Sequence, residues 1–206
     1  DLHSFPTRRS SDLRTFAFSR EDMMPRLRAC LTRSGYPLRL SEVSPDVMAL
    51  AREIYLEAMD LARPAVLTLE LSSEDVPAHL LPNALTGATS YNMILISIGS
   101  LLPERVAEYF GMEEPLKAVL LDSWGSESVE AVAHNVDRRL RAEKGEGSMR
   151  FAPGYGGFDV RKNVDWLEIM RKKSASSLDV AADPSTGILT PVKSILCMIG
   201  WGKRAE

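Results

Sequence analysis

The chain has 206 residues, of which 45% are hydrophobic and 26% are charged, and its net charge is −3. This composition is ordinary for a globular protein, and the length fits one domain or one domain with a small appendage. No apolar run reaches the roughly 18 residues of a membrane span, so no membrane contact is expected. The mild acidity gives no reason to expect a nucleic-acid partner.

The cysteines and histidines argue against a disulfide scaffold and a metal site. Cys30 and Cys197 lie far apart, and Cys197 stands in an apolar run, which favours a buried free thiol. This usage is typical of a reduced, cytoplasmic protein. His3, His79 and His134 have no zinc spacing, and the chain contains no Cys-x-x-Cys, so no metal ligands are predicted.

The first residues differ in character from the rest of the chain. They contain no apolar core and no cleavage site of a signal peptide. The run from His3 to Asp12 matches a translation of a common sequencing adapter. We therefore expect a non-native tail over residues 1–13, a natural sequence that begins near Arg14, and a missing true N-terminus. A natural, disordered basic tail is the alternative. The fold is predicted from residues 14–206, taken as a single domain.

The first predicted helix begins at Ser44-Pro45-Asp46, where Ser is the N-cap and Pro the first helical residue. Apolar residues recur at spacings of three and four as far as Leu61, and Arg63-Pro64 stops the helix. Residues 65–71 alternate and are rich in β-formers, which predicts a strand. Residues 91–98 indicate a second, largely buried strand, and the polar segment between the two is predicted to be a loop.

Two helices are predicted next. The first starts at about residue 101, carries Leu102, Val106 and Phe110 on its apolar side, and ends at Gly111. The second runs from about 113 to 143, with either a break or close packing at Gly125. Its predicted apolar stripe consists of Leu116, Leu120, Trp124, Val129, Val132, Val136 and Leu140.

The C-terminal third is expected to mix short strands with one helix. A strand over 148–151 leads into a turn, and a helix over about 160–172 follows. This helix is predicted to face inward through Val160, Val164, Leu167 and Met170. Short strands over 187–190 and 193–200 flank a turn at Pro191-Val192. Because the order is not a regular βα alternation, it favours an α+β fold with a mixed or antiparallel sheet flanked by helices.

Familiar catalytic motifs are missing from the sequence, so no catalytic residue is assigned. There is no P-loop, no Gly-x-Gly-x-x-Gly after a strand and no Gly-x-Ser-x-Gly. Metal hydrolysis, serine hydrolysis and kinase chemistry are therefore disfavoured.

One segment, Arg150-Phe151-Ala152-Pro153-Gly154-Tyr155, joins a guanidinium to a stiff turn and an aromatic ring. Pro153 fixes its own φ and pushes Ala152 to an extended conformation, while Gly154 tolerates a close ligand approach. Arg150 has a planar fork suited to a carboxylate, and Tyr155 can stack and hydrogen-bond. On the residues alone, a tight turn whose arginine binds local carbonyls is the simpler interpretation.

This segment resembles the S-adenosylmethionine-binding signature, Arg-x-x-x-Gly-Tyr, of the activation (reactivation) domain of cobalamin-dependent methionine synthase. Residues 120–131 are similar to the family's ligand-binding helix, and Glu130 matches its glutamate. Residues 191–201 are similar to the family's closing strand. The resemblance covers residues 90–201 and is greatest to stand-alone, single-domain members. The family's N-terminal acidic ligand-binding residue has no identifiable counterpart.

The resemblance implies an activation-domain-like fold and a cytoplasmic protein that binds S-adenosylmethionine. By resemblance, Arg150 binds the ligand's carboxylate, and Glu130 interacts with the positively charged end of the ligand. Ala152 and Tyr155 orient the adenosyl portion through their backbones, and Gly154 shapes the turn between them. In the family, the ligand's methyl passes to a corrinoid after one-electron reduction of the inactivated cobalt. The implied role is that of a methyltransferase module in methionine biosynthesis, which reactivates a cobalamin carried by a corrinoid-binding protein in trans.

Three other interpretations stay open. Glu130 falls with His134, Asp137 and Arg141 on a polar stripe that is typical of a solvated helix face. The missing acidic residue favours a non-catalytic interaction module of the same fold, which docks on a corrinoid protein without binding S-adenosylmethionine. An unrelated small-molecule enzyme built on the Gly154-Tyr155-Gly156-Gly157 loop is the third.

Overall fold

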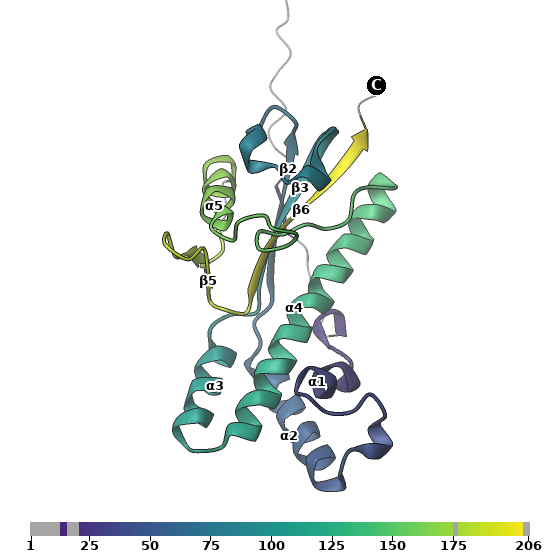
Figure 1. Ribbon diagram of the computed structural model, residues 1–206, viewed down its shortest axis with the longest axis vertical. Coiled ribbons are helices and arrows are strands. Elements are labelled where there is room, and N and C mark those ends of the chain that lie inside the picture. Colours follow the sequence, from purple (N-terminus) through teal and green to yellow (C-terminus); the bar gives the residue numbers. More distant parts are fainter. Residues whose placement is uncertain (1–12, 16–20, 175–176, 204–206) are drawn as a thin grey trace, which may run out of the picture.

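Four antiparallel strands form the central sheet, in the order β1-β2-β3-β6 (Figure 1). The computed structural model describes residues 13–15, 21–174 and 177–203. The strands are β1 (Leu13–Thr15), β2 (Ala65–Ser72), β3 (Ala88–Ser97) and β6 (Ser194–Lys203). The predicted α+β class with an antiparallel sheet is confirmed. Residues 1–12 of the expected tail lie outside the described residues, and Leu13 is the first residue of β1.

Five α-helices are described, together with short 3-10 helices at Glu21–Met23, Leu40–Glu42, Ala78–Leu80 and Asn83–Leu85. The α-helices are α1 (Leu27–Arg33), α2 (Pro45–Leu61), α3 (Leu101–Gly111), α4 (Pro115–Lys144) and α5 (Lys162–Lys173). Ser44 caps α2 as predicted, because its hydroxyl accepts from the Val47 N–H at 3.4 Å. Within the described part of the chain, no helix has the length and apolarity needed to cross a membrane.

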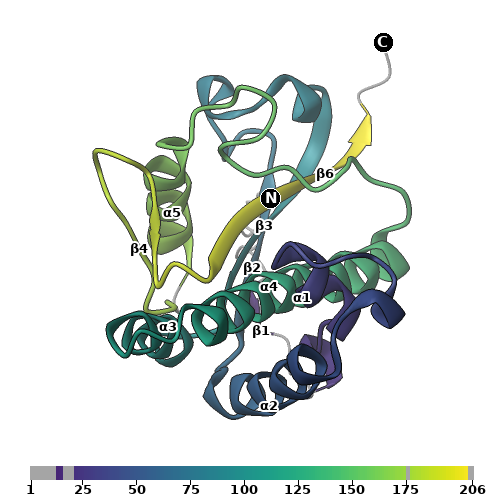
Figure 2. The same cartoon turned by 60° about the horizontal axis from the view of Figure 1, so that its bottom comes forward.

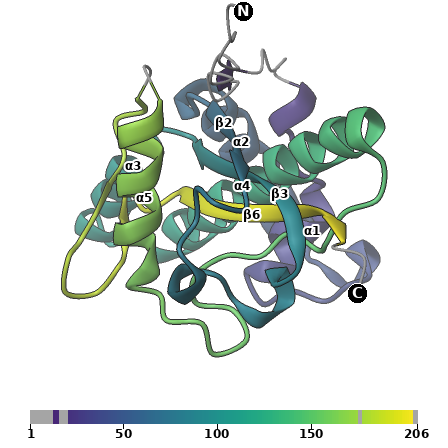
Figure 3. The same cartoon turned by 90° about the horizontal axis from the view of Figure 1, so that it is seen from above.

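Both faces of the sheet are covered, which makes the fold three-layered (Figures 2 and 3). On β3, Ile94 and Ile96 pack into the core shared with α1 to α4, whereas Met93 and Leu95 pack into the core beneath α5. All four side chains are at most 1% exposed. Because each face has its own hydrophobic core, the strand is apolar at consecutive positions from Met93 to Ile96 rather than at alternate ones. The prediction of a largely buried strand there is confirmed.

The long helix α4 is continuous over 30 residues. Of the two predicted alternatives at Gly125, the break is therefore excluded and close packing is confirmed. A Cβ there would lie 2.8 Å from Leu102 Cδ2 and 3.3 Å from Lys193 Cε. The predicted stripe of α4 is buried except at Leu116. Near the start of the helix the buried residue is Ala118 instead.

The predicted inward faces of two other helices need correction. On α3, Phe110 is 55% exposed and Tyr109 is buried in its place, where its hydroxyl donates to a carboxylate oxygen of Glu57 at 2.6 Å. Before α5, Val160 lies outside the helix and is exposed, whereas Trp166 is fully buried and donates from its indole nitrogen to a backbone carbonyl. A polar tip with a partner lets each aromatic ring enter the core.

Two predicted strands form differently from expectation. Over 148–151 there is no continuous strand, only isolated bridges to β6 at Gly147 and Phe151. The reason is local: the Gly200 N–H donates to the Ser148 hydroxyl at 2.9 Å, so a side chain replaces a ladder carbonyl. The second is the strand predicted over 187–190, of which only β5 (Leu189–Thr190) forms. It pairs with β4 (Ala181–Ala182) in a separate two-stranded sheet.

Candidate functional site

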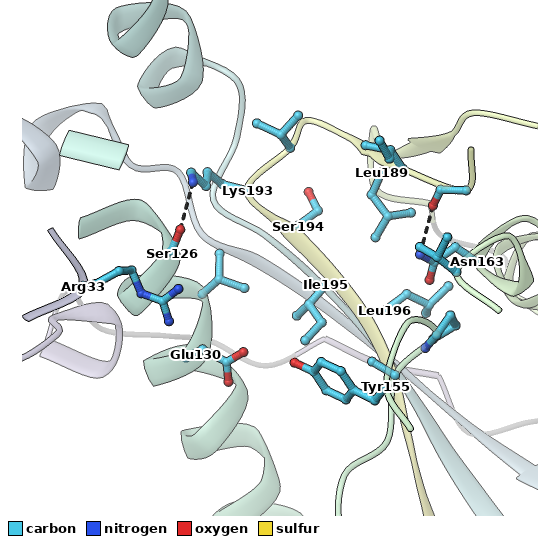
Figure 4. A pocket seen from close by; sticks show the side chains of 17 residues that line it. Arg33, Ser126, Glu130, Tyr155, Asn163, Leu189, Lys193, Ser194, Ile195 and Leu196 are labelled. Carbon is cyan, nitrogen blue, oxygen red and sulfur yellow. Dashed lines mark hydrogen bonds between the residues drawn. The ribbon is translucent and has the colours of Figure 1, made fainter. Parts of the chain in front are cut away.

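A cavity of about 320 Å³ opens between α4, the turn over residues 151–160 and the connection from β5 to β6 (Figure 4). Three of the five predicted site residues, Glu130, Ala152 and Tyr155, line it. The volume is near the lower end of the range of about 300–1,000 Å³ that is common for small-molecule sites. The cavity therefore brings together residues that the sequence resemblance placed on two separate segments.

The signature turn is fixed to the edge of the central sheet. Phe151 exchanges two backbone hydrogen bonds with Met198 of β6, at 2.9 and 2.8 Å. Gly154 has a φ of +97°, a left-handed conformation that favours glycine, and its N–H donates to the Phe158 carbonyl at 2.7 Å. This closed turn buries Ala152 and leaves Tyr155 half exposed at the cavity wall. Gly154 shapes the turn without lining the cavity.

The two charged residues of the signature meet each other. Arg150 Nη2 lies 2.6 Å from Glu130 Oε2, and the Arg150 side chain is only 19% exposed. Arg150 does not itself line the cavity but holds the carboxylate that does. The simpler interpretation, an arginine bound to local carbonyls, describes Arg141 instead, which donates to the carbonyls of Gly147 and Ser148.

Three carboxylates on neighbouring turns of α4 are each paired with a cation from a different segment. The pairs are Asp122–Lys193 at 2.7 Å, Glu127–Arg33 at 2.6 Å and Glu130–Arg150 at 2.6 Å. Arg33 from α1 and Lys193, which directly precedes β6, also line the cavity, and neither was predicted as a site residue. We call this the charged end of the cavity: Arg33, Ser126, Glu130 and Lys193.

The polar stripe on α4 divides into two parts. His134 is exposed, and Asp137 pairs with Arg141 at 2.8 Å along the helix, as expected of a solvated face. Glu130 differs because it lies in the cavity wall, and Tyr155 extends from the turn toward it (Figure 4). A surface role alone therefore does not describe Glu130.

Burial raises the pKa values of three side chains near the charged end of the cavity. Partial burial and then the negative charge of Glu130 raise the pKa of Tyr155, so its phenol stays protonated at neutral pH and remains a hydrogen-bond donor. Burial raises the pKa of Cys197 to about 12, and that of Cys30 likewise to about 12. Both cysteines are free and buried, as predicted for Cys197. Neither thiol is a nucleophile at neutral pH.

Comparison with solved structures bears on the fold. The crystal structure of the MetH reactivation domain bound to AdoHcy superposes with a TM-score of 0.64, at 11% sequence identity, over 96% of this chain and 81% of that chain. The fold is that of the MetH reactivation domain. The sequence resemblance therefore predicted the fold correctly. No protein-family model and no curated protein matches the sequence.

In this MetH reactivation-domain fold, the second end of the cavity is mostly apolar. We call it the apolar end: Val160, Asn163, Ile188, Leu189 and Leu196. Asn163 is 7% exposed, and its amide nitrogen donates to the Gly187 carbonyl at 3.0 Å. Its other amide atom, Oδ1, is buried and has no hydrogen-bond partner among the described residues.

Sequence reasoning missed the residues of this end, although one signal was present. In the predicted helix over 160–172, Asn163 stands three residues after Val160 and four before Leu167, on the face assigned to the core. A polar side chain on such a face marks a buried group that needs partners. No comparable signal existed for Arg33, because its place in the cavity depends on how α1 packs against α4.

Proposed function

We propose that this protein binds S-adenosylmethionine in the cavity and supports the reductive methylation of a cobalamin carried by a partner protein. One observation supports the proposal most strongly. Glu130, Ala152 and Tyr155, which the signature resemblance assigned to the ligand, line a single cavity. They do so in the fold of a reactivation domain whose crystal structure contains AdoHcy, S-adenosylhomocysteine.

The residues present fit the chemistry of this ligand. S-adenosylmethionine carries a carboxylate, an ammonium, a sulfonium and an adenine. Glu130, in the cavity wall, suits the two positive groups. Arg33 and Lys193, the cations that line the cavity, suit the ligand's carboxylate. Arg150, which lies outside the lining, holds Glu130 in place through one nitrogen.

The role of this chain is to hold and orient the ligand. When bound, S-adenosylmethionine supplies a methyl group to a reduced corrinoid, which is itself the nucleophile. The chain then needs no acid or base of its own, and its contribution is positioning. Tyr155 serves this purpose, because its protonated phenol remains a donor at neutral pH beside Glu130. We further propose a cytoplasmic location, where the corrinoid protein would be met in trans.

Calorimetric titration of the full chain tests the proposal, with S-adenosylmethionine and S-adenosylhomocysteine as ligands. We expect saturable one-to-one binding. Glu130→Gln should weaken it about tenfold, as expected for loss of a charged hydrogen bond. Asp137→Asn is the matched control, because Asp137 is also ion-paired on α4 but lies outside the cavity. Absence of binding to the folded wild type would contradict the proposal.

An interaction module without the small ligand is the second candidate. It is favoured by Arg33: α1 contributes a cation to the cavity, and no acidic side chain from the described N-terminal residues lines it. Both candidates predict a complex with a purified corrinoid protein. Only the first predicts that S-adenosylmethionine changes the affinity of that complex, which sedimentation or calorimetry measures directly.

A further inference from the structure

The two ends of the cavity differ in what they offer a ligand. The charged end presents Arg33, Glu130 and Lys193, whereas the apolar end presents aliphatic side chains around one amide, Asn163 (Figure 4). A ligand with a zwitterionic part and a flat heteroaromatic part matches this division in one direction only. The zwitterion belongs beside the charges, and the ring belongs beside the aliphatic side chains.

The orientation of the Asn163 amide is determined by its neighbour. The Gly187 carbonyl can only accept a hydrogen bond, so the NH₂ group of Asn163 must face it, at 3.0 Å. Oδ1 is therefore the atom left for another partner. As an amide oxygen it can only accept, so whatever satisfies it must be a donor.

The wall that carries Gly187 approaches α5 very closely. A Cβ at Gly187 would lie 2.4 Å from the Val160 carbonyl oxygen and 2.5 Å from Arg161 Cα, and φ is +72°. The turn is also closed by Asp183, whose Oδ1 accepts from the backbone N–H groups of Ser185 and Thr186 at 2.9 and 2.7 Å. The Asn163 amide thus rests on a wall with little freedom to move.

An acceptor that is buried without a partner costs about 1–3 kcal/mol, and such atoms are rare in native proteins. Within the described residues one other buried side-chain atom lacks a partner, the Trp124 indole nitrogen, which lies away from this cavity against Tyr55. Asn163 Oδ1 is therefore the unpartnered acceptor of a residue that lines the candidate site. A bound ligand with a suitably placed donor would remove its cost.

We propose that Asn163 recognises the 6-amino group of adenine, so that the ligand lies with its adenine at the apolar end and its amino-acid part at the charged end. The proposal rests on the proposed function. The ligand's ammonium finds its partner in Glu130, and its remaining donors are the ribose hydroxyls and the 6-amino group. Among these, the 6-amino group is attached to a flat ring that the surrounding aliphatic side chains can cover.

The test compares S-adenosylhomocysteine with its 6-deamino analogue, which carries only hydrogen at C6 of the purine. The analogue loses the 6-amino donor and gains no other donor, so Asn163 Oδ1 would keep no partner. Calorimetry on the full wild-type chain should show at least about tenfold tighter binding of S-adenosylhomocysteine. In Asn163→Leu, which has similar volume and no acceptor, that preference should disappear.

Controls keep the result specific. Asn135 also donates from its amide to a backbone carbonyl, that of Asp22 at 2.6 Å, but lies outside the cavity. Asn135→Leu should retain the preference. Asn163→Ala, which introduces no extra volume, replaces Asn163→Leu if the latter does not fold.

The outcomes separate this inference from the function on which it rests. If neither nucleoside binds the folded wild type, both proposals fail. If both bind equally well, the proposed function stands and the role of Asn163 is overturned. A preference that persists in folded Asn163→Leu or Asn163→Ala also overturns it.

Discussion

The charged end and the apolar end of the cavity differ in whether their polar groups already have partners within the protein. At the charged end, Glu130 is already held by Arg150, and Arg33 and Lys193 are already held by other carboxylates of α4. At the apolar end, Asn163 keeps one acceptor without a partner. A ligand therefore competes with existing ion pairs at one end and adds a new contact at the other. Because ion-pair exchange yields little net free energy, discrimination between ligands should arise mainly at the apolar end.

The largest effect is expected where the apolar end packs most closely. Gly187→Ala should destabilise the protein by about 3 kcal/mol, because a Cβ would meet backbone atoms and the residue would hold a positive φ. Gly87→Ala is the control: its φ is +85° but no atom lies within 4 Å, so a cost of about 1 kcal/mol is expected. Urea unfolding measures both. Equal costs would show that the wall at Gly187 is not rigid.

Arg150→Ala probes the charged end. It leaves Glu130, which lines the cavity, without its 2.6 Å partner. We expect binding of S-adenosylmethionine to weaken by about 1.5–3 kcal/mol in calorimetry. Arg139→Ala should leave binding unchanged, because Arg139 pairs with Asp22 away from the cavity. Equal affinities of wild type and Arg150→Ala would rule out the role of this arginine.

A smaller effect is expected from pH at the turn that supports the apolar end. Hydrogen bonds, first from the Ser185 side chain and then from Thr186, lower the pKa of Asp183 to about 2. Since the folded pKa lies below the ordinary value, the stabilisation is present above about pH 4 and is lost as the pH falls toward 2. Asp183→Asn should flatten the fall of thermal stability between about pH 4 and pH 2. An unchanged slope in the variant would contradict this.

The smallest effect concerns the two thiols beneath the charged end. Because burial raises the pKa of Cys30 and of Cys197 to about 12, neither should react with a disulfide reagent at pH 8 while the protein is folded. Both should react after unfolding in guanidinium. Rapid reaction of either thiol in the folded protein would show that this side of α4 opens to solvent.

The sequence predicted most of the fold where local rules suffice. Ser44 and Pro45 began a helix as expected, and the strands over 65–71 and 91–98 were identified from their composition. The strand over 148–151 was wrong because a single hydroxyl, that of Ser148, interrupts the ladder. The three-residue strand β1 was missed because so short a segment has no readable pattern.

Fewer of the residues that line the cavity were predicted, because they come from segments that lie far apart in the sequence. Glu130, Ala152 and Tyr155 came from resemblance and do line a cavity. Arg33 and Lys193 reach the same cavity from segments 160 residues apart in sequence, and no local pattern indicates that meeting. Asn163 is a third case. Its position on an apolar helix face could be read from the sequence, but its place in the cavity wall could not.

The signature turn also has a consequence for the behaviour of the free chain in solution. β6 is the edge strand of the central sheet, and the segment before the turn covers that edge through two isolated bridges, at Gly147 and Phe151. An uncovered edge strand offers its backbone groups to another copy of the chain and promotes aggregation. The segment that shapes one wall of the cavity thus also protects an edge strand, so damage to the turn should first be seen as light scattering.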